Sequence, residues 1–266
     1  MVEQGRPVPI QSVDRALQIL TLFSHRHPLL GVSEISRSLS LAKGTVHGLV
    51  RTLARQGFLQ QDTETRKYRL GLKIHELGII LAGTLELNQK AAGPAVQLAK
   101  RTQALCRVAI WDGDSVVITL NAHPRPRAVL PHQIGPRVHA YCSGMGKAVL
   151  AFLSDQALKD YLKRTTLAPF TPSTITDRRR LLADLEKTRA SGYAIDREEA
   201  VQGIGCIGAP VFQREGTVGG AMSLSGPPKR VLGTRMEGLA EELLRTTAEV
   251  SQYMGYFRPT MEIEIT

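Results

Sequence analysis

Apolar residues repeat with helical spacing in two short segments near the N-terminus. In the first, Val32, Ile35 and Leu39 lie three and four positions apart. In the second, apolar residues recur at i, i+3, i+4 and i+7, namely Val46, Leu49, Val50 and Leu53. Only a short connection separates the two series, so we predict two helices around a tight turn. This spacing is typical of a helix-turn-helix, whose second helix crosses the first and projects outward.

The residues after the second helix predict a β-hairpin. Gly57 is expected to end the helix, and two strand-like runs, 58–61 and 67–70, flank the polar turn 62–65. Arg66 and Lys67 would lie near the tip of this hairpin, where a wing contacts phosphate. The segment therefore predicts a winged helix-turn-helix.

The outward face of the second helix suits a DNA major groove. Its side chains are small, hydrogen-bonding or cationic and include no carboxylate: Lys43, Gly44, Thr45, His47, Gly48, Arg51 and Arg55. We expect Arg51 and Thr45 to contact bases, and Lys43, Arg66 and Lys67 to contact phosphate. The residues predicted to bind DNA are Arg37, Lys43, Thr45, His47, Arg51, Arg66 and Lys67. A three-helix structural bundle with a solvated charged face would show the same pattern, and the residues alone leave that alternative open.

The charge distribution supports a nucleic-acid partner. The chain has a formal net charge of +10, and residues 6–73 contain 11 Lys and Arg against 4 Asp and Glu. A basic field of this kind displaces counterions from a phosphate backbone and gives a salt-dependent affinity. Charge alone is weak evidence, because many basic domains bind no nucleic acid.

A helix is expected on each side of the winged segment. The earlier one would begin after Ser12 as N-cap, and its apolar positions are Val13, Ala16, Leu17, Leu20 and Phe23. The later one has apolar residues at spacings of four, three and four: Leu70, Ile74, Leu77 and Leu81. We interpret it as a linker. It could pack on its own domain or contact a second copy of the chain, and the spacing favours neither.

Beyond about residue 88 the pattern mixes helices and strands. Helices are predicted at 91–102, 144–153, 155–163, 176–190 with Thr176 as N-cap, and 234–254. Strands are predicted at 106–111, 115–121, 204–212 and 218–224. This order describes an α/β sandwich with an antiparallel sheet, a common container for small ligands.

Composition sets broad limits on the protein. The 266 residues, 42% hydrophobic and 22% charged, are ordinary for a globular protein with two domains. No apolar run approaches the roughly 18 residues that a membrane-spanning helix needs, and no signal peptide is recognisable, so we expect a cytoplasmic protein without a membrane partner. The three widely spaced cysteines, Cys106, Cys142 and Cys206, are expected to be reduced thiols.

Several motifs of catalysis and cofactor binding lack their required context. Residues 203–208 match GxGxxG, but the chain continues as a strand where a dinucleotide site needs a helix. Residues 144–147 resemble the end of a phosphate loop without its first glycine or its magnesium-binding hydroxyl. The possible metal ligands His123, His132, His139 and Cys142 fit no standard spacing. We expect no catalytic residues, no metal and no cofactor.

Taken together, the motifs resemble the IclR family of bacterial transcriptional regulators over nearly the whole chain. The matching segments, in order, are SVDRALQIL at 12–20, GTVH at 44–47, YRLG at 68–71, SGMGKA at 143–148, GIGCIGAPV at 203–211 and SLSGP at 223–227. The resemblance implies an α+β protein with a winged helix-turn-helix at 1–70, a dimerising linker helix at 71–87 and a GAF-like effector-binding domain at 88–266. It also implies a homodimer or homotetramer that binds a double-stranded DNA operator.

The resemblance further implies a site for a small-molecule effector, an organic acid in many relatives. Gly144 and Met145 match the loop whose backbone amides contact the acid group in such relatives. The matching polar wall is Asp196, Cys206, Ser223 and Ser225. Met145 stands where relatives often have a smaller residue, which would narrow the pocket. The alternatives are purely structural: both serines would only form hydrogen bonds with backbone groups at a strand end, and Asp196 would be a turn carboxylate facing water.

Two other classes of function are weighed against a regulator. The second domain could be an enzyme or a ligand-binding module, with the winged segment serving protein contacts, or the chain could be a purely structural oligomer. Catalytic pairs of carboxylates or histidines would favour an enzyme, and none is apparent. The sequence does not predict the effector, the operator, the number of subunits, or whether transcription is repressed or activated.

Overall fold

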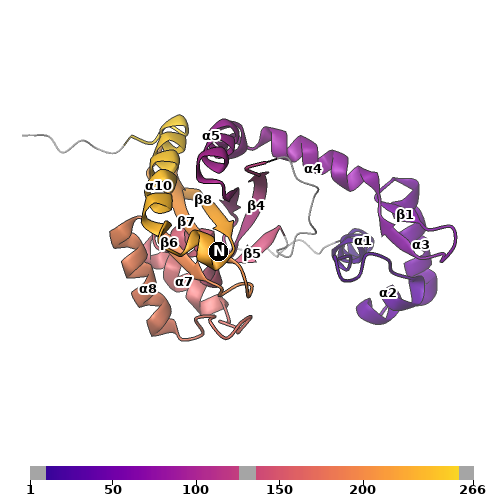
Figure 1. The fold of residues 1–266 in the computed structure, drawn as a ribbon. Coiled ribbons are helices and arrows are strands. Elements are labelled where there is room, and N and C mark those ends of the chain that lie inside the picture. Colours follow the sequence, from indigo (N-terminus) through magenta and orange to yellow (C-terminus); the bar gives the residue numbers. More distant parts are fainter. Residues whose placement is uncertain (1–9, 126–135, 258–266) are drawn as a thin grey trace, which may run out of the picture. The chain divides into compact units, whose positions relative to one another are not determined.

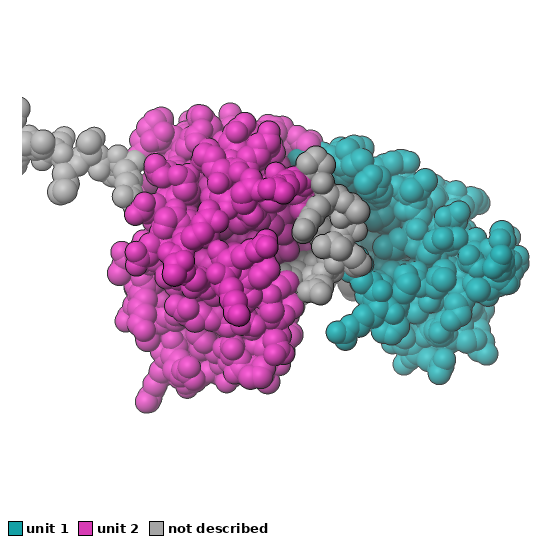
Figure 2. Space-filling model, viewed as in Figure 1, with its two compact units in different colours: residues 1–82 teal, residues 83–266 magenta. Residues whose placement is uncertain are grey.

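The computed structural model describes residues 10–125 and 136–257, and the remaining residues lie outside the description. The chain divides into two compact units, Met1–Ala82 and Gly83–Thr266, which are coloured separately in Figure 2. Each unit is described by itself.

The first unit is a winged helix-turn-helix (Figure 1). Its elements in chain order are α1 (Gln11–Thr21), α2 (Val32–Leu39), α3 (Lys43–Arg55), β1 (Leu59–Gln61), β2 (Tyr68–Leu70) and α4 (Leu72–Thr84). Strands β1 and β2 pair antiparallel, and Leu30 adds a bridge to Tyr68. The helix-turn-helix and hairpin predicted from the sequence are confirmed.

The core of this unit is formed by the apolar positions that repeat in the sequence. Its buried residues come from α1, α2, α3 and both strands: Ile19, Ile35, Val46, Val50, Leu59 and Tyr68. The tight turn between α2 and α3 is made possible by Ser40, which adopts a left-handed backbone with φ 53°. The predicted cap of α1 is wrong, because the helix begins at Gln11 with Ile10 as N-cap and no side-chain cap.

The second unit is built on one six-stranded antiparallel sheet in the order β5-β4-β3-β8-β7-β6. The strands are β3 (Leu105–Trp111), β4 (Ser115–Ala122), β5 (Arg137–His139), β6 (Ala194–Arg197), β7 (Gly205–Phe212) and β8 (Val218–Gly226). Its helices are α5 (Glu86–Thr102), η1 (Ala140–Cys142), α6 (Gly144–Leu150), α7 (Asp155–Arg164), α8 (Arg178–Ser191), α9 (Pro228–Val231) and α10 (Met236–Tyr253). The α+β class with an antiparallel sheet is confirmed.

Helices cover both faces of this sheet (Figure 1). Helices α5 and α10 share an apolar core with one face, which includes Val108, Ile207 and Leu224. Helix α6 packs on the other face through Met145 and Val149. We call that second surface the α6 face, because all the candidate ligand-binding residues described below lie on it.

Four short elements of the second unit were not predicted, namely β5, η1, β6 and α9. Their three or four residues are too short to display a period. The predicted cap of α8 is wrong, because the helix begins at Arg178 and Asp177 caps it. The Asp177 carboxylate accepts a hydrogen bond from the backbone N–H of Arg180 at 2.9 Å.

Candidate functional site

Helix α3 presents one face to the core and the other to solvent. Val46 and Val50 are fully buried, whereas the side chains predicted to bind DNA from this helix are exposed: Lys43, Thr45, His47 and Arg51. A methyl group added at Gly44 or Gly48 would meet no atom within 4 Å, so no described residue of this unit covers the helix at these two positions. The helix therefore offers hydrogen-bonding and cationic groups to an approaching duplex.

The remaining residues predicted to contact DNA differ in their exposure and in whether another side chain already binds them. Arg37 on α2 is exposed, with its Nε 3.4 Å from the Ser33 carbonyl oxygen. Arg66 is exposed at the wing and has a left-handed backbone with φ 59°. Lys67 instead forms an ion pair with Glu34 on α2, at 3.2 Å.

The Lys67–Glu34 pair connects the wing to the start of α2. Glu34 accepts the backbone N–H of Gly31 at 2.6 Å. That hydrogen bond and the pair with Lys67 hold the pKa of Glu34 below its ordinary value. A phosphate that binds Lys67 must compete with this carboxylate, and no pattern in the sequence indicates the Lys67–Glu34 pair.

In the second unit, the strand register brings the matched polar residues into two adjacent rows on the α6 face. One row runs across three strands as Asp196, Cys206 and Ser225. The other runs across four strands as Gly208, Ser223, Arg107 and Asn121. Directly paired residues in an antiparallel sheet project from the same face, so both rows point the same way.

Helix α6 starts directly above this polar surface. A methyl group added at Gly208 would overlap the backbone of Gly144, so glycine is required at Gly208 for the helix to approach β7 so closely. This packing role, and not dinucleotide binding, accounts for the glycine at this position of the GxGxxG match. The first amides of a helix have no intrahelical acceptor, so those of Gly144 and Met145 are candidates for a bound group.

Contacts among the polar residues on the α6 face are sparse. The Cys206 Sγ and Ser225 Oγ atoms are 2.7 Å apart, and Arg107 Nη1 is 3.5 Å from the same Ser225 oxygen. Ser223 is fully buried, and within the described residues its hydroxyl has no hydrogen-bond partner. The serines therefore do not satisfy backbone groups, and that alternative is wrong.

Asp196 is a buried strand residue, so the alternative of a turn carboxylate facing water is also wrong. Its Oδ1 accepts the backbone N–H of Glu199 at 2.7 Å. Burial, reinforced by the nearby Glu199 charge, raises the pKa of Asp196 to about 7, although the Glu199 amide and Lys147 oppose the shift. The carboxyl group can therefore be protonated near neutral pH.

Lys147, the residue that resembles a phosphate-loop lysine, is fully buried in an internal ion cluster. Its Nζ lies 2.6 Å from Glu199 Oε1 and 2.8 Å from Asp184 Oδ2. Burial alone would lower the pKa of Lys147, but these carboxylates raise it overall. The lysine is thus occupied by protein carboxylates.

The cysteines have no nucleophilic character. All three are buried, and burial raises the pKa of the Cys206 thiol to about 11 and those of Cys106 and Cys142 to about 12. A nucleophilic cysteine needs a lowered pKa instead. Among the described residues no cluster of three or more potential metal ligands occurs, and His132 lies outside them.

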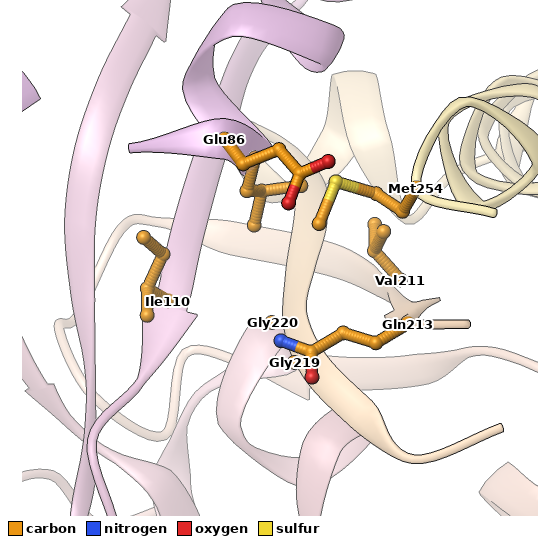
Figure 3. Close-up of a pocket in the computed structure, with 8 residues that line it drawn as sticks. Glu86, Ile110, Val211, Gln213, Gly219, Gly220 and Met254 are labelled. Atoms are coloured by element: carbon orange, nitrogen blue, oxygen red, sulfur yellow. The ribbon is translucent and has the colours of Figure 1, made fainter. Parts of the chain in front are cut away.

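Two cavities are lined by residues outside the polar rows, although Glu199, which lines the second, donates its backbone N–H to Asp196. One, of about 140 Å³, is lined by residues of α5, β3, β7 and β8, and by Gln213 and Met254, which follow β7 and α10 (Figure 3). The other, of about 480 Å³, lies along α8 and β6 and includes Asp184, Arg197 and Glu199. No helix in the described part of the chain is long and apolar enough to cross a membrane.

Sequence reasoning missed Arg107 and Asn121. Both stand in the second row, and Arg107 Nε lies 3.3 Å from Asn121 Oδ1. The one available signal was a lone charged residue inside the apolar run of β3.

A winged helix-turn-helix with an open cationic face, joined to a separate α/β unit with a buried polar surface, defines a DNA-binding regulator with a distinct regulatory unit. Residues 12–63 match the IclR helix-turn-helix domain, and residues 81–252 match the family described as bacterial transcriptional regulator IclR C-terminal. The chain therefore belongs to the IclR family of bacterial transcriptional regulators.

Similar proteins cover nearly the full length. The chain is 36% identical to the transcriptional regulator XynR of Escherichia coli, over 93% of this chain and 98% of that protein. It is 30% identical to the transcriptional repressor AllR of the same species, over 95% and 94%. The crystal structure of Thermotoga maritima IclR has 29% identity and a TM-score of 0.73, and covers 93% of this chain and 100% of its own.

These comparisons confirm the predicted family and its general function. The protein is a helix-turn-helix transcriptional regulator and not an enzyme. The relatives therefore support a regulator over the alternatives of an enzyme or ligand-binding module with a protein-binding winged segment and of a purely structural oligomer.

Proposed function

We propose that this protein binds an operator as a symmetric oligomer and that a small organic acid on the α6 face changes that binding. The observation that carries the proposal is the combination of an exposed cationic reading helix with a second unit whose buried polar surface includes a hydroxyl, that of Ser223, without a hydrogen-bond partner among the described residues. Buried polar groups in folded proteins are normally paired. The unpaired Ser223 hydroxyl is therefore a candidate ligand contact.

Arg51 and Thr45 are proposed to contact base edges, His47 to lie in the same groove, and Lys43 and Arg37 to contact phosphate. Arg66 would contact phosphate from the wing, and Lys67 would do so at the expense of its pair with Glu34. Arginine and threonine are suited to base edges because they can donate hydrogen bonds in the major groove.

The linker helix α4 supports the oligomer. None of its residues is buried, although it carries several large apolar side chains, and Leu72, Leu77, Ile79 and Ile80 are all exposed. Contiguous exposed apolar surface of this kind marks an interface. We propose a dimer through this helix, with two dimers able to form a tetramer, and with domain boundaries at 1–70, 71–87 and 88–266.

The effector would occupy the surface formed by Gly144, Met145, Asp196, Cys206, Ser223 and Ser225. One solved protein of the same fold, an IclR homologue from Microbacterium hydrocarbonoxydans, is complexed with 4-hydroxybenzoate. Its 22% identity supports the fold alone. A ligand that favours one arrangement of the second units would shift the spacing of the two reading helices, and so the affinity for the operator. As a DNA-binding protein the regulator would act in the cytoplasm.

The test is fluorescence-anisotropy binding to the DNA upstream of the protein's own gene, against a scrambled duplex of equal length. Titrations at about 50 mM and about 200 mM salt measure the electrostatic part of the affinity. We expect tight, salt-dependent binding that prefers the upstream DNA, and release by small acids. Equal binding to both duplexes, with or without acids, would contradict the proposal for this operator.

A further inference from the structure

Arg107 is a buried cation without a charged partner. Its side chain extends from β3 on the α6 face, and the residue is 7% exposed. Its hydrogen bonds are to neutral groups only, the Asn121 amide oxygen and the Ser225 hydroxyl. Within the described residues it forms no salt bridge.

Lys147, a second buried cation among the described residues of this unit, has the carboxylate partners that Arg107 lacks. Lys147 is fully buried and has two carboxylates within 2.8 Å. Burying a charge without an opposite charge is costly, so buried cations are normally paired. A folded protein that leaves Arg107 unpaired gains from any anion that enters beside it.

The neighbours of Arg107 define the rest of the site. Ser223 lies directly across the β3–β8 pair from Arg107, and within the described residues its buried hydroxyl forms no hydrogen bond of normal geometry. Ser225 lies two residues after Ser223 on β8, on the same face of the sheet, and its hydroxyl already contacts the Arg107 guanidinium. A planar guanidinium beside two hydroxyls suits a carboxylate, which accepts several hydrogen bonds at once.

The acidic residue of the site, Asp196, lies at the end of the first row that is farthest from Arg107. Asp196 on β6 is three strands from β3, about 14 Å at the usual strand spacing. This separation explains why Arg107 and Asp196 form no ion pair. Asp196 lies on the same α6 face, so a molecule long enough to reach from Arg107 past the start of α6, which packs on Cys206 and Gly208, would bring a hydroxyl to its carboxyl group.

We propose that Arg107 binds the carboxylate of the effector and that the effector is a hydroxylated organic acid, its hydroxyl groups contacting Ser223 and the Asp196 end of the surface. This inference rests on the proposed function, because it assigns chemistry to the same ligand surface. It adds a specificity-determining residue, Arg107, to those implied by family resemblance.

The experiment measures ligand binding to the full-length protein by calorimetry, with three acids and their neutral counterparts. The pairs are glycolate and glycolamide, gluconate and sorbitol, and 4-hydroxybenzoate and 4-hydroxybenzamide. At least one acid is expected to bind the unmodified protein, and its neutral counterpart to bind about 10- to 100-fold more weakly, because a charge-assisted hydrogen bond is lost.

Variants locate the effect. Arg107→Met should weaken binding of that acid by a similar factor, and Arg107→Lys should weaken it less. Arg179→Met is the matched control, since Arg179 is an exposed arginine on α8. Without ligand, Arg107→Met should not lower the melting temperature of the second unit, because it removes an uncompensated buried charge.

Three results would overturn the inference: no acid of the panel binds, a neutral counterpart binds as tightly as its acid, or Arg107→Met leaves acid binding unchanged. A large loss of melting temperature in Arg107→Met would assign the arginine a structural role instead. Operator binding, measured in parallel on the same samples, reports on the proposed function separately. Its failure would leave the calorimetric result on Arg107 standing.

Discussion

The two units of this protein present polar side chains in opposite ways. In the first, the groups available to a partner lie on the exposed face of one helix, α3, and are close in sequence. In the second, they lie buried on a sheet and come from strands that span residues 105 to 226. An exposed surface suits a large, flat, charged partner such as DNA. A buried one suits a small molecule that can be enclosed.

The largest effect is expected from Lys147→Met, which leaves the buried Glu199 and the partly exposed Asp184 without their cation. The second unit should lose about 3–5 kcal/mol of stability. Urea unfolding followed by fluorescence of Trp111, the single tryptophan, reports on this unit. Lys159→Met, an exposed lysine on α7, is the control. A loss no larger than the control's would show that the cluster is not needed to hold α6.

Ile80→Asp tests whether α4 is an interface. Ile80 is 63% exposed within one chain, and burying such a side chain contributes about 1.5–3 kcal/mol, or roughly 10- to 150-fold in a dimer dissociation constant. Sedimentation velocity across a range of concentrations should show weakened association. Leu182→Asp on α8 changes an exposed apolar residue elsewhere and serves as the comparison. If the unmodified protein is a monomer, or the variant associates equally well, α4 is not the contact.

Arg51→Ala tests base reading by α3. We expect a loss of about 1–3 kcal/mol on the specific duplex and a relaxed preference at one base pair, with little change on random DNA. Anisotropy titrations against a set of single-base operator variants would locate that base pair. Equal loss on specific and random DNA would reduce Arg51 to a phosphate contact.

The pH dependence of stability tests the burial of Asp196. Because burial raises its pKa to about 7, the folded state retains a proton that the unfolded chain releases near pH 4. The contribution of Asp196 to stability is therefore greatest below that range and should fall as the pH rises toward 7, by on the order of 1 kcal/mol per pH unit. Asp196→Asn should flatten this slope, although Glu199, whose pKa burial also raises, retains part of it. Parallel stability profiles for the two proteins would contradict the assignment.

The smallest effect is expected at the wing. Glu34→Gln removes the carboxylate that pairs with Lys67 and should strengthen binding to every DNA sequence by roughly two- to fivefold. Lys67→Ala should weaken binding to all sequences alike and reduce the salt slope by about one. If both variants bind as the unmodified protein does, Lys67 contacts no phosphate.

The difference between a site on one helix and a site assembled from several strands also explains which residues the sequence could predict. The helix-turn-helix was predictable because Val46 and Val50 repeat with the period of one helix, and exposure of Arg51 follows from the same period. Asp196 was found only through family resemblance, since β6 is too short to show a period. Arg107 was missed because its partners become neighbours only when β3 pairs with β4 and β8. The cap errors at Ser12 and Thr176 are displacements of helix starts by one or two residues.

One measurement tests the separation of the two sites most directly: operator binding by anisotropy, with and without an acid that binds, for the unmodified protein, Arg51→Ala and Arg107→Met. We predict that Arg51→Ala loses operator affinity but still binds the acid in calorimetry. Arg107→Met should bind the operator normally and no longer respond to the acid. Loss of both properties in either variant, or an acid response that survives in Arg107→Met, would contradict the account.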